Sequence, residues 1–458
     1  MNLIIKNGTV VTAENVSRAN ILVSGGKISK VSASVLSAKG AATIDASGKY
    51  VFPGVIDPHV HLGLEAYGSR TADDFMSGTR AASSGGVTTV IDYAIPGKWE
   101  TLAGAVSRRL VEARGSYIDY SFHAQITNWS PETQSDFENL VSSGITSFKI
   151  FMPKTEGWGL NDWELLKIFE KASTLPVIIE LHAESGPLIE GFIADLVSRK
   201  KTGVGDFYYT RPNIVEEEAV SRACFLAGKT GAKIYIVHTT TAGAVEITGR
   251  ARASGVKVML ETCPQYLMLT NSVFKKKNGC LFATCPPVKL PSDNDALWTG
   301  LKDGSVRTVG TDHCAFSKSD KLTCAGDFRK LRFGMPGVET SLEILHSEGV
   351  VKKRISFKKL VEITSENAAK IFGLYPKKGA IKPGSDADLV IFDPSREWTV
   401  KYENLNTRCG WTPYEGMKIT GKVAATILRG KIIYDRGEFL SENGYGKFLK
   451  RKGGMFLC

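Results

Sequence analysis

Short apolar runs rich in β-branched residues alternate with amphipathic helical patterns through the middle of this chain, and this alternation constrains the fold more than any other feature. Such runs occupy residues 145–151, 177–182, 234–238 and 306–313. Helical patterns separate them, for example at residues 162–172. Short, continuously apolar runs are typical of strands buried on both faces, and strands that alternate with helices form parallel β-α-β units. The sequence therefore predicts an α/β fold with a parallel sheet.

Residues that could bind a metal ion occur within or at the ends of these runs. They are His59, His61, Lys149, His182, His238 and Asp312. His59 and His61 point to the same side of a strand, because residues two apart share a face. Since a (β/α)8 barrel carries its chemistry at the carboxyl ends of its strands, the pattern predicts a TIM-like barrel with a metal site at that end.

Each of these residues also has a purely structural interpretation when it is taken alone. A single core histidine is more often hydrogen-bonded than ligating, and Asp312 could cap the next helix. Lys149 could extend to the surface, but its neighbour Phe148 and the apolar run leave it little surface to reach. A lysine inside a barrel must be neutralised, paired or modified. Together the residues favour a functional site, whereas His123 and His346 lack this context and are interpreted as structural.

The two ends of the chain share a different pattern, with strand-like alternation interrupted by hairpin signals such as Asn-Gly and Gly-Gly. Neither end can bury the core of a sandwich alone. We therefore expect one small β-sandwich domain built from residues 1–52 and 376–440. The barrel of residues 53–375 would be inserted between them, and residues 441–458 would form a tail at a subunit interface.

Composition excludes several classes of function. The 458 residues carry a net charge of +11, but the lysines are mostly scattered and no aromatic–basic platform accompanies them, so nucleic-acid binding is not expected. The eight cysteines have no Cys-x-x-Cys spacing and are interpreted as reduced thiols. No apolar stretch approaches the ~18 residues of a membrane span, and no signal-peptide pattern is visible, which predicts a cytoplasmic protein without membrane contact.

The order of these motifs resembles the amidohydrolase superfamily and, more narrowly, the hydantoinase and dihydropyrimidinase group of cyclic amidases. The motifs are Asp-x-His-x-His at 57–61, the strand lysine, two strand-end histidines and Thr-Asp-His at 311–313. Gly-Tyr-Gly-Lys-Phe-Leu-Lys-Arg at 444–451 is also similar to that group. The resemblance runs through the whole chain and implies a metal-dependent hydrolase that opens a cyclic amide ring.

The ligand set predicts more than one metal ion, because four histidines, an acid and a lysine exceed what one tetrahedral zinc needs. We expect two divalent ions, with zinc favoured and manganese, cobalt or iron as alternatives. In the enzymes that this chain resembles, carbon dioxide carbamylates the strand lysine, here Lys149, which then bridges both ions. The resemblance implies one ion held by His59, His61, Lys149 and Asp312, and another held by Lys149, His182 and His238.

The same resemblance implies a mechanism and an assembly. A hydroxide that bridges the metals would attack the amide carbonyl, and Asp312 would act as general base and then as general acid. His313 would support the site without ligating a metal. The partners would be a small cyclic amide and identical subunits in a homotetramer, or alternatively a homodimer.

Substrate recognition departs from the pattern of that group. Its members usually have a tyrosine where this chain has Lys154, often a serine where it has Cys285, and commonly an asparagine where it has Phe333. We expect these residues to contact substrate and to change ring specificity. An apolar rim suited to a bulky substituent is expected from Leu64, Met152 and Trp158.

Other functions on the same scaffold remain open at this point. Allantoinase, dihydroorotase or imidase activity is compatible with the altered contacts. A non-enzymatic role like that of the collapsin response mediators fits less well, because those proteins have lost metal ligands that this chain keeps.

Overall fold

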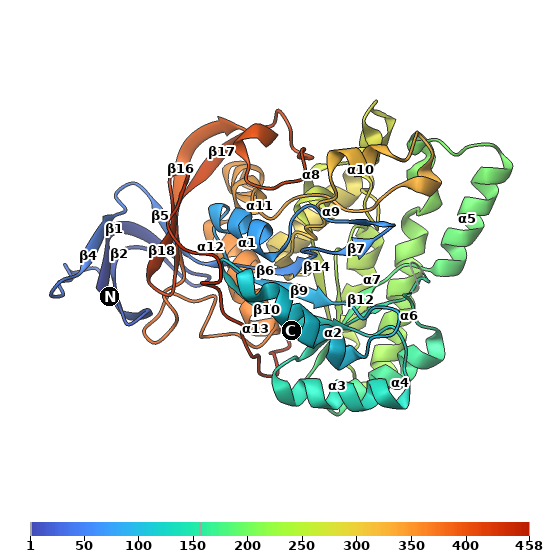
Figure 1. Cartoon of the computed structure of the whole chain (residues 1–458), viewed down its shortest axis with the longest axis horizontal. Helices are drawn as coiled ribbons and strands as arrows, with labels where there is room; N and C mark the ends of the chain where they lie inside the picture. The colour runs from blue at the N-terminus through green and yellow to red at the C-terminus, as the bar shows by residue number, and fades with distance from the viewer. Residues whose placement is uncertain (1, 155–157, 458) are drawn as a thin grey trace.

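The computed structural model describes residues 2–154 and 158–457. A parallel barrel with its helices forms one side of the molecule, and a sheet built from both ends of the chain forms the other (Figure 1). The predicted fold class, a TIM-like barrel with a β-domain from both termini, is confirmed.

Eight parallel strands form the barrel. They are β6 (Val55–Val60), β9 (Val87–Ala94), β10 (Asp119–Gln125), β11 (Ser147–Phe151), β12 (Ile178–His182), β13 (Ile234–Ile236), β14 (Val258–Thr262) and β15 (Thr308–Val309). Between the first and the last of them, Val60 bridges His313, and the His61 amide donates to the His313 carbonyl at 2.9 Å. This contact joins the two edges and closes the barrel. The strands are buried almost throughout, as expected where helices cover a parallel sheet.

Helices surround the barrel and fill the connections. They are α1 (Phe75–Ser84), α2 (Leu102–Glu112), α3 (Pro131–Ser143), α4 (Asp162–Ser173), α5 (Gly186–Ser198), α6 (Asn213–Thr230), α7 (Ala242–Ala253), α8 (Pro264–Met268), α9 (Pro291–Asp303), α10 (Lys318–Leu322), α11 (Ser341–Leu345), α12 (Phe357–Val361) and α13 (Asn367–Ile371). Helix α4 illustrates the local rules, because Asn161 and Glu164 form a capping box at its start. Its buried face consists of Leu165, Ile168, Phe169 and Ala172, a helical spacing that confirms the prediction for 162–172.

Strands β13 and β15 end earlier than the sequence predicts. The expectation that strands run through His238 and Asp312 is wrong, because both residues adopt the left-handed region, with φ of 40° and 51°. Such angles cannot continue a strand, so both side chains project from irregular backbone just beyond the strand ends. Non-glycine residues in this region are strained and concentrate at functional sites.

The sheet from the chain ends has its own core. Its strands are β1 (Asn2–Val11), β2 (Val16–Ser24), β3 (Lys27–Ser32), β4 (Ala42–Asp45), β5 (Tyr50–Pro53), β16 (Leu389–Thr399), β17 (Lys418–Leu428), β18 (Lys431–Asp435) and β19 (Glu438–Phe439). Strand β5 joins the two halves, because it pairs parallel to β1 and antiparallel to β16. Buried side chains such as Leu3, Ile21 and Ile427 form a cluster separate from the barrel core.

The tail after β19 passes beneath the barrel. The Tyr120 amide donates to the Lys447 carbonyl at 3.0 Å, and the Leu449 amide donates to Tyr120 at 2.8 Å. Arg451 is buried, and its guanidinium donates to Ser121 Oγ at 2.9 Å and to the Phe122 carbonyl. The tail therefore completes the floor of its own barrel, while its place at a subunit interface stays a prediction.

The described residues include no helix that is both long enough and apolar enough to span a bilayer. The described cysteines are free thiols, which agrees with the expectation of no disulfide framework.

Candidate metal centre and active site

One cavity at the carboxyl ends of the barrel strands collects all the predicted metal ligands. These are His59, His61, Lys149, His182, His238 and Asp312. The Nε2 atoms of His59 and His61 each lie 3.2 Å from Oδ1 of Asp312. The ring centroid of His238 lies 5.5 Å from that of His59 and 4.7 Å from that of His182. Strands far apart in the sequence thus bring the six side chains to one place.

Lys149 is buried in the middle of β11, and its Nζ lies over the rings of Tyr93 (5.1 Å) and Phe151 (5.2 Å). Burial disfavours the ammonium form and lowers the pKa of Lys149 to about 8, although nearby carboxylates such as Glu180 oppose the shift. The neutral amine is therefore readily accessible. A neutral amine is nucleophilic, which makes this lysine suitable for covalent modification.

Glu261, at the end of β14, holds two of the candidate ligands and was not identified from the sequence. Its Oε1 accepts hydrogen bonds from His59 Nδ1 (2.7 Å) and from the His238 amide (3.1 Å), while Oε2 accepts one from Tyr235 (2.9 Å). The carboxylate fixes which nitrogen of His59 faces the cavity, as partners of metal-bound histidines do. The only sequence signal was an acid inside the apolar run at 258–262.

A second buried carboxylate, Glu180 of β12, lies below Lys149 and was also missed. Its Oε1 lies 2.6 Å from His123 Nδ1, whose hydrogen-bond partner is Ser147 Oγ, and its Oε2 accepts a hydrogen bond from Tyr93 at 3.0 Å. His123 also donates from Nε2 to the Pro58 carbonyl at 2.9 Å, so both of its ring nitrogens have partners inside the core. His346 likewise donates from Nδ1 to the Thr420 carbonyl at 2.8 Å. These contacts agree with the structural interpretation of both histidines.

His182 interacts with a further acid beside the cavity. Its Nε2 lies 2.7 Å from Glu184 Oε2, an oxygen that also accepts from Arg211 and lies 3.6 Å from Cys285 Sγ. Despite burial, the charge of Arg211 lowers the pKa of Glu184 to about 2. Glu184 is therefore an anion that orients His182.

His313 points away from the cavity. Its Nε2 lies 3.3 Å from Asp73 Oδ2, and its Nδ1 accepts from the Gly337 amide at 3.2 Å. The ring lies between β6 and the segment that follows β15, where it supports the closure of the barrel.

Residues 50–433 match the amidohydrolase family. The chain is 40% identical over 456 residues to a D-hydantoinase of Geobacillus stearothermophilus, covering 98% of this chain and 97% of that protein. The chain belongs to the amidohydrolase family. Among solved structures, a dihydropyrimidinase from Brevibacillus agri superposes with a TM-score of 0.97 at 37% identity, covering 99% of this chain and 100% of that chain. An L-hydantoinase from Arthrobacter aurescens superposes with a TM-score of 0.91 at 30% identity, covering 98% of this chain and 99% of that chain.

This amidohydrolase has a donor set that fits a divalent metal ion. His59, His61 and Asp312 offer atoms within 4.8 Å of one another. The buried His59 Nε2 and His238 Nδ1 have no hydrogen-bond partner among the described residues. Buried polar atoms without partners are uncommon in folded proteins, and imidazole with carboxylate is a favourable donor set for a metal such as zinc. On the other side of the cavity, Glu184 already occupies one nitrogen of His182.

The predicted substrate contacts of the amidohydrolase divide into two groups. Cys285 and Phe333 line the cavity, as do Leu64 and Trp158 of the predicted apolar rim. Lys154 is exposed and is not among the described lining residues, and residues 155–157 lie outside the described part of the chain. The predicted rim residue Met152 is instead buried in the barrel core.

Proposed function

We propose that this protein is a metal-dependent hydrolase that opens the ring of a cyclic amide. The observation that carries the proposal is the set of six donor residues around one cavity, in an amidohydrolase whose relatives are named D-hydantoinase and dihydropyrimidinase over nearly the full length. The cyclic amide would enter between the donor residues and the apolar side chains of Leu64, Trp158 and Phe333.

The cofactor in this proposal is a pair of divalent ions, with zinc favoured and manganese, cobalt or iron as alternatives. His59, His61 and Asp312 would hold one ion, His182 and His238 would hold the other, and a carbamylated Lys149 would contribute to both. When bound, divalent ions supply Lewis acidity that polarises a carbonyl and favours the deprotonation of water. The lowered pKa of Lys149 supports its modification, because only the neutral amine reacts with carbon dioxide.

Asp312 is the general base in this proposal. Burial opposes its ionisation, but His59 and His61 hold the pKa of Asp312 well below its usual value, so the carboxylate is available at neutral pH. It would take a proton from the attacking water and deliver it to the ring nitrogen as the carbon–nitrogen bond breaks. One residue would thus serve as base and then as acid, and each proton transfer would stay inside the cavity.

Ring specificity would depend on the residues that replace the usual polar contacts. Cys285 is held against Glu184, and Phe333 packs on Phe207 with ring centroids 5.4 Å apart. Neither side chain supplies a strong partner for a ring carbonyl, and an unpaired polar atom costs about 1–3 kcal/mol. Plain hydantoin and dihydrouracil are therefore expected to be poor substrates, while Lys154 stays a proposed contact.

We also propose a cytoplasmic homotetramer, with a homodimer as the alternative. The free thiols of the described cysteines support a reducing compartment. Light scattering on the purified protein measures the mass of the assembly directly.

The test of the proposed function combines metal analysis with turnover. Protein purified without chelator is expected to contain about two transition-metal ions per chain and to open substituted hydantoins, and removal of the metal should abolish the activity reversibly. A fully active protein with one ion or less would refute the binuclear site. A metal-loaded protein that opens no cyclic amide or imide in a broad panel would refute the function itself.

A further inference from the structure

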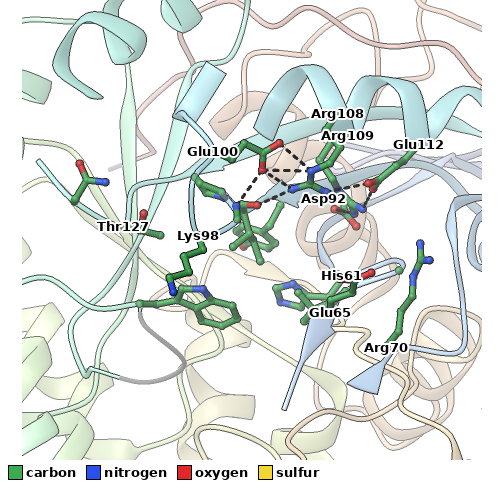
Figure 2. A pocket seen from close by; sticks show the side chains of 18 residues that line it. His61, Glu65, Arg70, Asp92, Lys98, Glu100, Arg108, Arg109, Glu112 and Thr127 are labelled. Carbon is green, nitrogen blue, oxygen red and sulfur yellow. Dashed lines mark hydrogen bonds and ion pairs between the residues drawn. The ribbon is translucent and has the colours of Figure 1, made fainter. Parts of the chain in front are cut away.

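A second, larger cavity of about 820 Å³ opens directly beside the candidate active site (Figure 2). The two cavities share the side chains of His61, Leu64, Ile95 and Trp158 as their common wall. His61 is also a proposed metal ligand. A molecule whose ring lies against these residues can therefore extend a substituent into the larger cavity.

Most of the charged side chains around this cavity neutralise one another. Arg108 binds Glu100 at 3.0 Å and Glu112 at 2.9 Å, and it also donates to the Ile95 carbonyl. Arg109 is buried and binds Asp92 and Glu112. Figure 2 shows this network along one side of the cavity. Since these groups already have partners, they have little capacity left for a ligand.

Three charged side chains of the lining have no ion pair with another described residue. They are Arg70, Lys98 and Glu65. Arg70 makes no side-chain hydrogen bond among the described residues either. Lys98 lies over the ring of Trp99 at 5.1 Å and is otherwise exposed. Glu65 lies opposite Arg70 across a short hairpin, but no ion pair joins the two side chains, so two cations and one anion of the lining stay unpaired among the described residues.

The fold holds Arg70 close to the candidate metal centre. It lies on a small hairpin of β7 (Glu65–Ala66) and β8 (Ser69–Arg70) that begins just after His61. Thr71 fixes the base of this hairpin, because its hydroxyl accepts from the Leu64 amide at 2.9 Å and donates to the His61 carbonyl at 3.3 Å. Thr71, the residue directly after Arg70, is thus tied to the same strand end as the proposed ligand His61.

Gly63 gives the guanidinium its room. This residue has a φ of 64°, and a Cβ built on it would lie 3.1 Å from an Arg70 Nη atom. Any side chain at this position would press on the guanidinium. Arg70 therefore lies over the bare backbone of Gly63, two residues beyond His61, and lines the larger cavity.

We propose that the natural substrate is a cyclic amide that carries a carboxylate on its side arm, and that Arg70 binds this carboxylate. The proposal rests on the proposed function. A guanidinium binds a carboxylate through two parallel hydrogen bonds, and neither the paired arginines nor the apolar wall offers such a contact. A cationic side arm would find only Glu65 and would face both free cations, and an uncharged arm would leave the two cations without a partner.

The experiment compares two hydantoins that differ only in charge, with a 2-carboxyethyl or a 2-carbamoylethyl arm on the same ring carbon. The metal-loaded protein is expected to show a kcat/KM about tenfold higher for the carboxylate, a ratio typical of an exposed charge-assisted contact, and added salt should reduce this preference. Arg70→Gln should bring the ratio close to one. Arg70→Lys should retain part of the preference for the carboxylate, because lysine keeps the positive charge but cannot form the two parallel hydrogen bonds of a guanidinium.

Arg18→Gln, an exposed arginine of β2 far from the cavity, is the matched control and should leave the ratio unchanged. Calorimetric affinities of the two ring-opened products give a readout that does not depend on turnover. The carboxylate product should bind about tenfold more tightly to the wild type and lose this advantage in Arg70→Gln.

The possible failures are distinguishable. If the wild type opens both rings at equal rates or prefers the amide, the substituent proposal is overturned and the proposed function stands. An unchanged ratio in Arg70→Gln overturns the assignment of Arg70. If metal-loaded protein opens neither ring but opens other cyclic amides of the panel, the substituent proposal is overturned and the proposed function stands; if it opens none of the panel, the proposed function has failed and the substituent proposal falls with it.

Discussion

Replacing Glu261 with glutamine is expected to weaken metal binding without disturbing the shape of the site. Glutamine is isosteric with glutamate, and its carbonyl oxygen can still accept from His59 Nδ1 and the His238 amide. Its amide group would face the Tyr235 hydroxyl, which also lies against Thr308. The substitution therefore removes one negative charge and keeps the hydrogen-bond geometry.

The magnitude follows from the bond to His59. A hydrogen bond to a charged group contributes about 1.5–3 kcal/mol and a neutral one about 0.5–1.5 kcal/mol, so the expected loss is about 1.4 kcal/mol. This corresponds to about a tenfold weaker metal affinity, at the lower end of the effects known for such supporting groups. The pKa of His59 supports the role of the Glu261 charge. Burial disfavours the protonated ring, but Glu261 and then Asp312 raise the pKa of His59 to about 9.

Competition with a chelator measures the metal affinity directly, and kcat at saturating metal separates binding from chemistry. Glu246→Gln is the matched control, because this glutamate is exposed on α7 and, among the described residues, forms an ion pair only with Arg250. An affinity of Glu261→Gln equal to that of the wild type would refute the reasoning, since it would mean that the charge behind His59 has no effect on the metal.

Substitutions at three further residues test other parts of the molecule. Lys149→Ala should abolish turnover and lower metal content, and Lys149→Arg should fail as well because a guanidinium keeps its charge; near-normal activity in either would reduce Lys149 to a packing residue. Asp312→Asn should lower kcat by about 10²–10⁴ with only a modest loss of metal, and unchanged turnover with full metal content would move the proton transfer to another group. Phe169→Ala, in the buried face of α4, should cost about 3–5 kcal/mol of unfolding free energy in denaturant titrations; a cost below about 1 kcal/mol would show that the core collapses around the gap.

The sequence predicted the fold and the six residues that gather in one cavity because both leave a local pattern. Apolar runs that end on His182 or contain Lys149 combine a strand signal with chemistry at one position. Glu261 leaves no such pattern, since one acid in a strand has the same appearance whether it binds a histidine or faces solvent. The left-handed turns at His238 and Asp312 were equally invisible, because neither residue type requires them.

Long-range contacts were the other part that the sequence could not predict. Arg451 is the last residue of a motif that resembles the family, but its burial beneath the barrel depends on backbone and side-chain groups of residues 120–122. Likewise, Arg70 became a candidate only when the structure placed the hairpin beside the wall of the larger cavity. In both cases the role of the arginine depends on its neighbours in the fold: the side chain of Arg451 has hydrogen-bond partners, whereas that of Arg70 has none among the described residues.

The tail beneath the barrel has a consequence for how the protein folds during its synthesis. Arg451 and Ser121 are separated by 330 residues, and strand β5 pairs with β16 from the far end of the chain. During synthesis, the outer sheet therefore stays incomplete until β16 to β19 have emerged from the ribosome, and the barrel floor until Arg451 has emerged. Contacts of such long sequence separation form slowly, and the unfinished barrel exposes strand edges in the meantime. Docking of the tail is thus a late folding step, and chaperone demand should be greatest before it occurs.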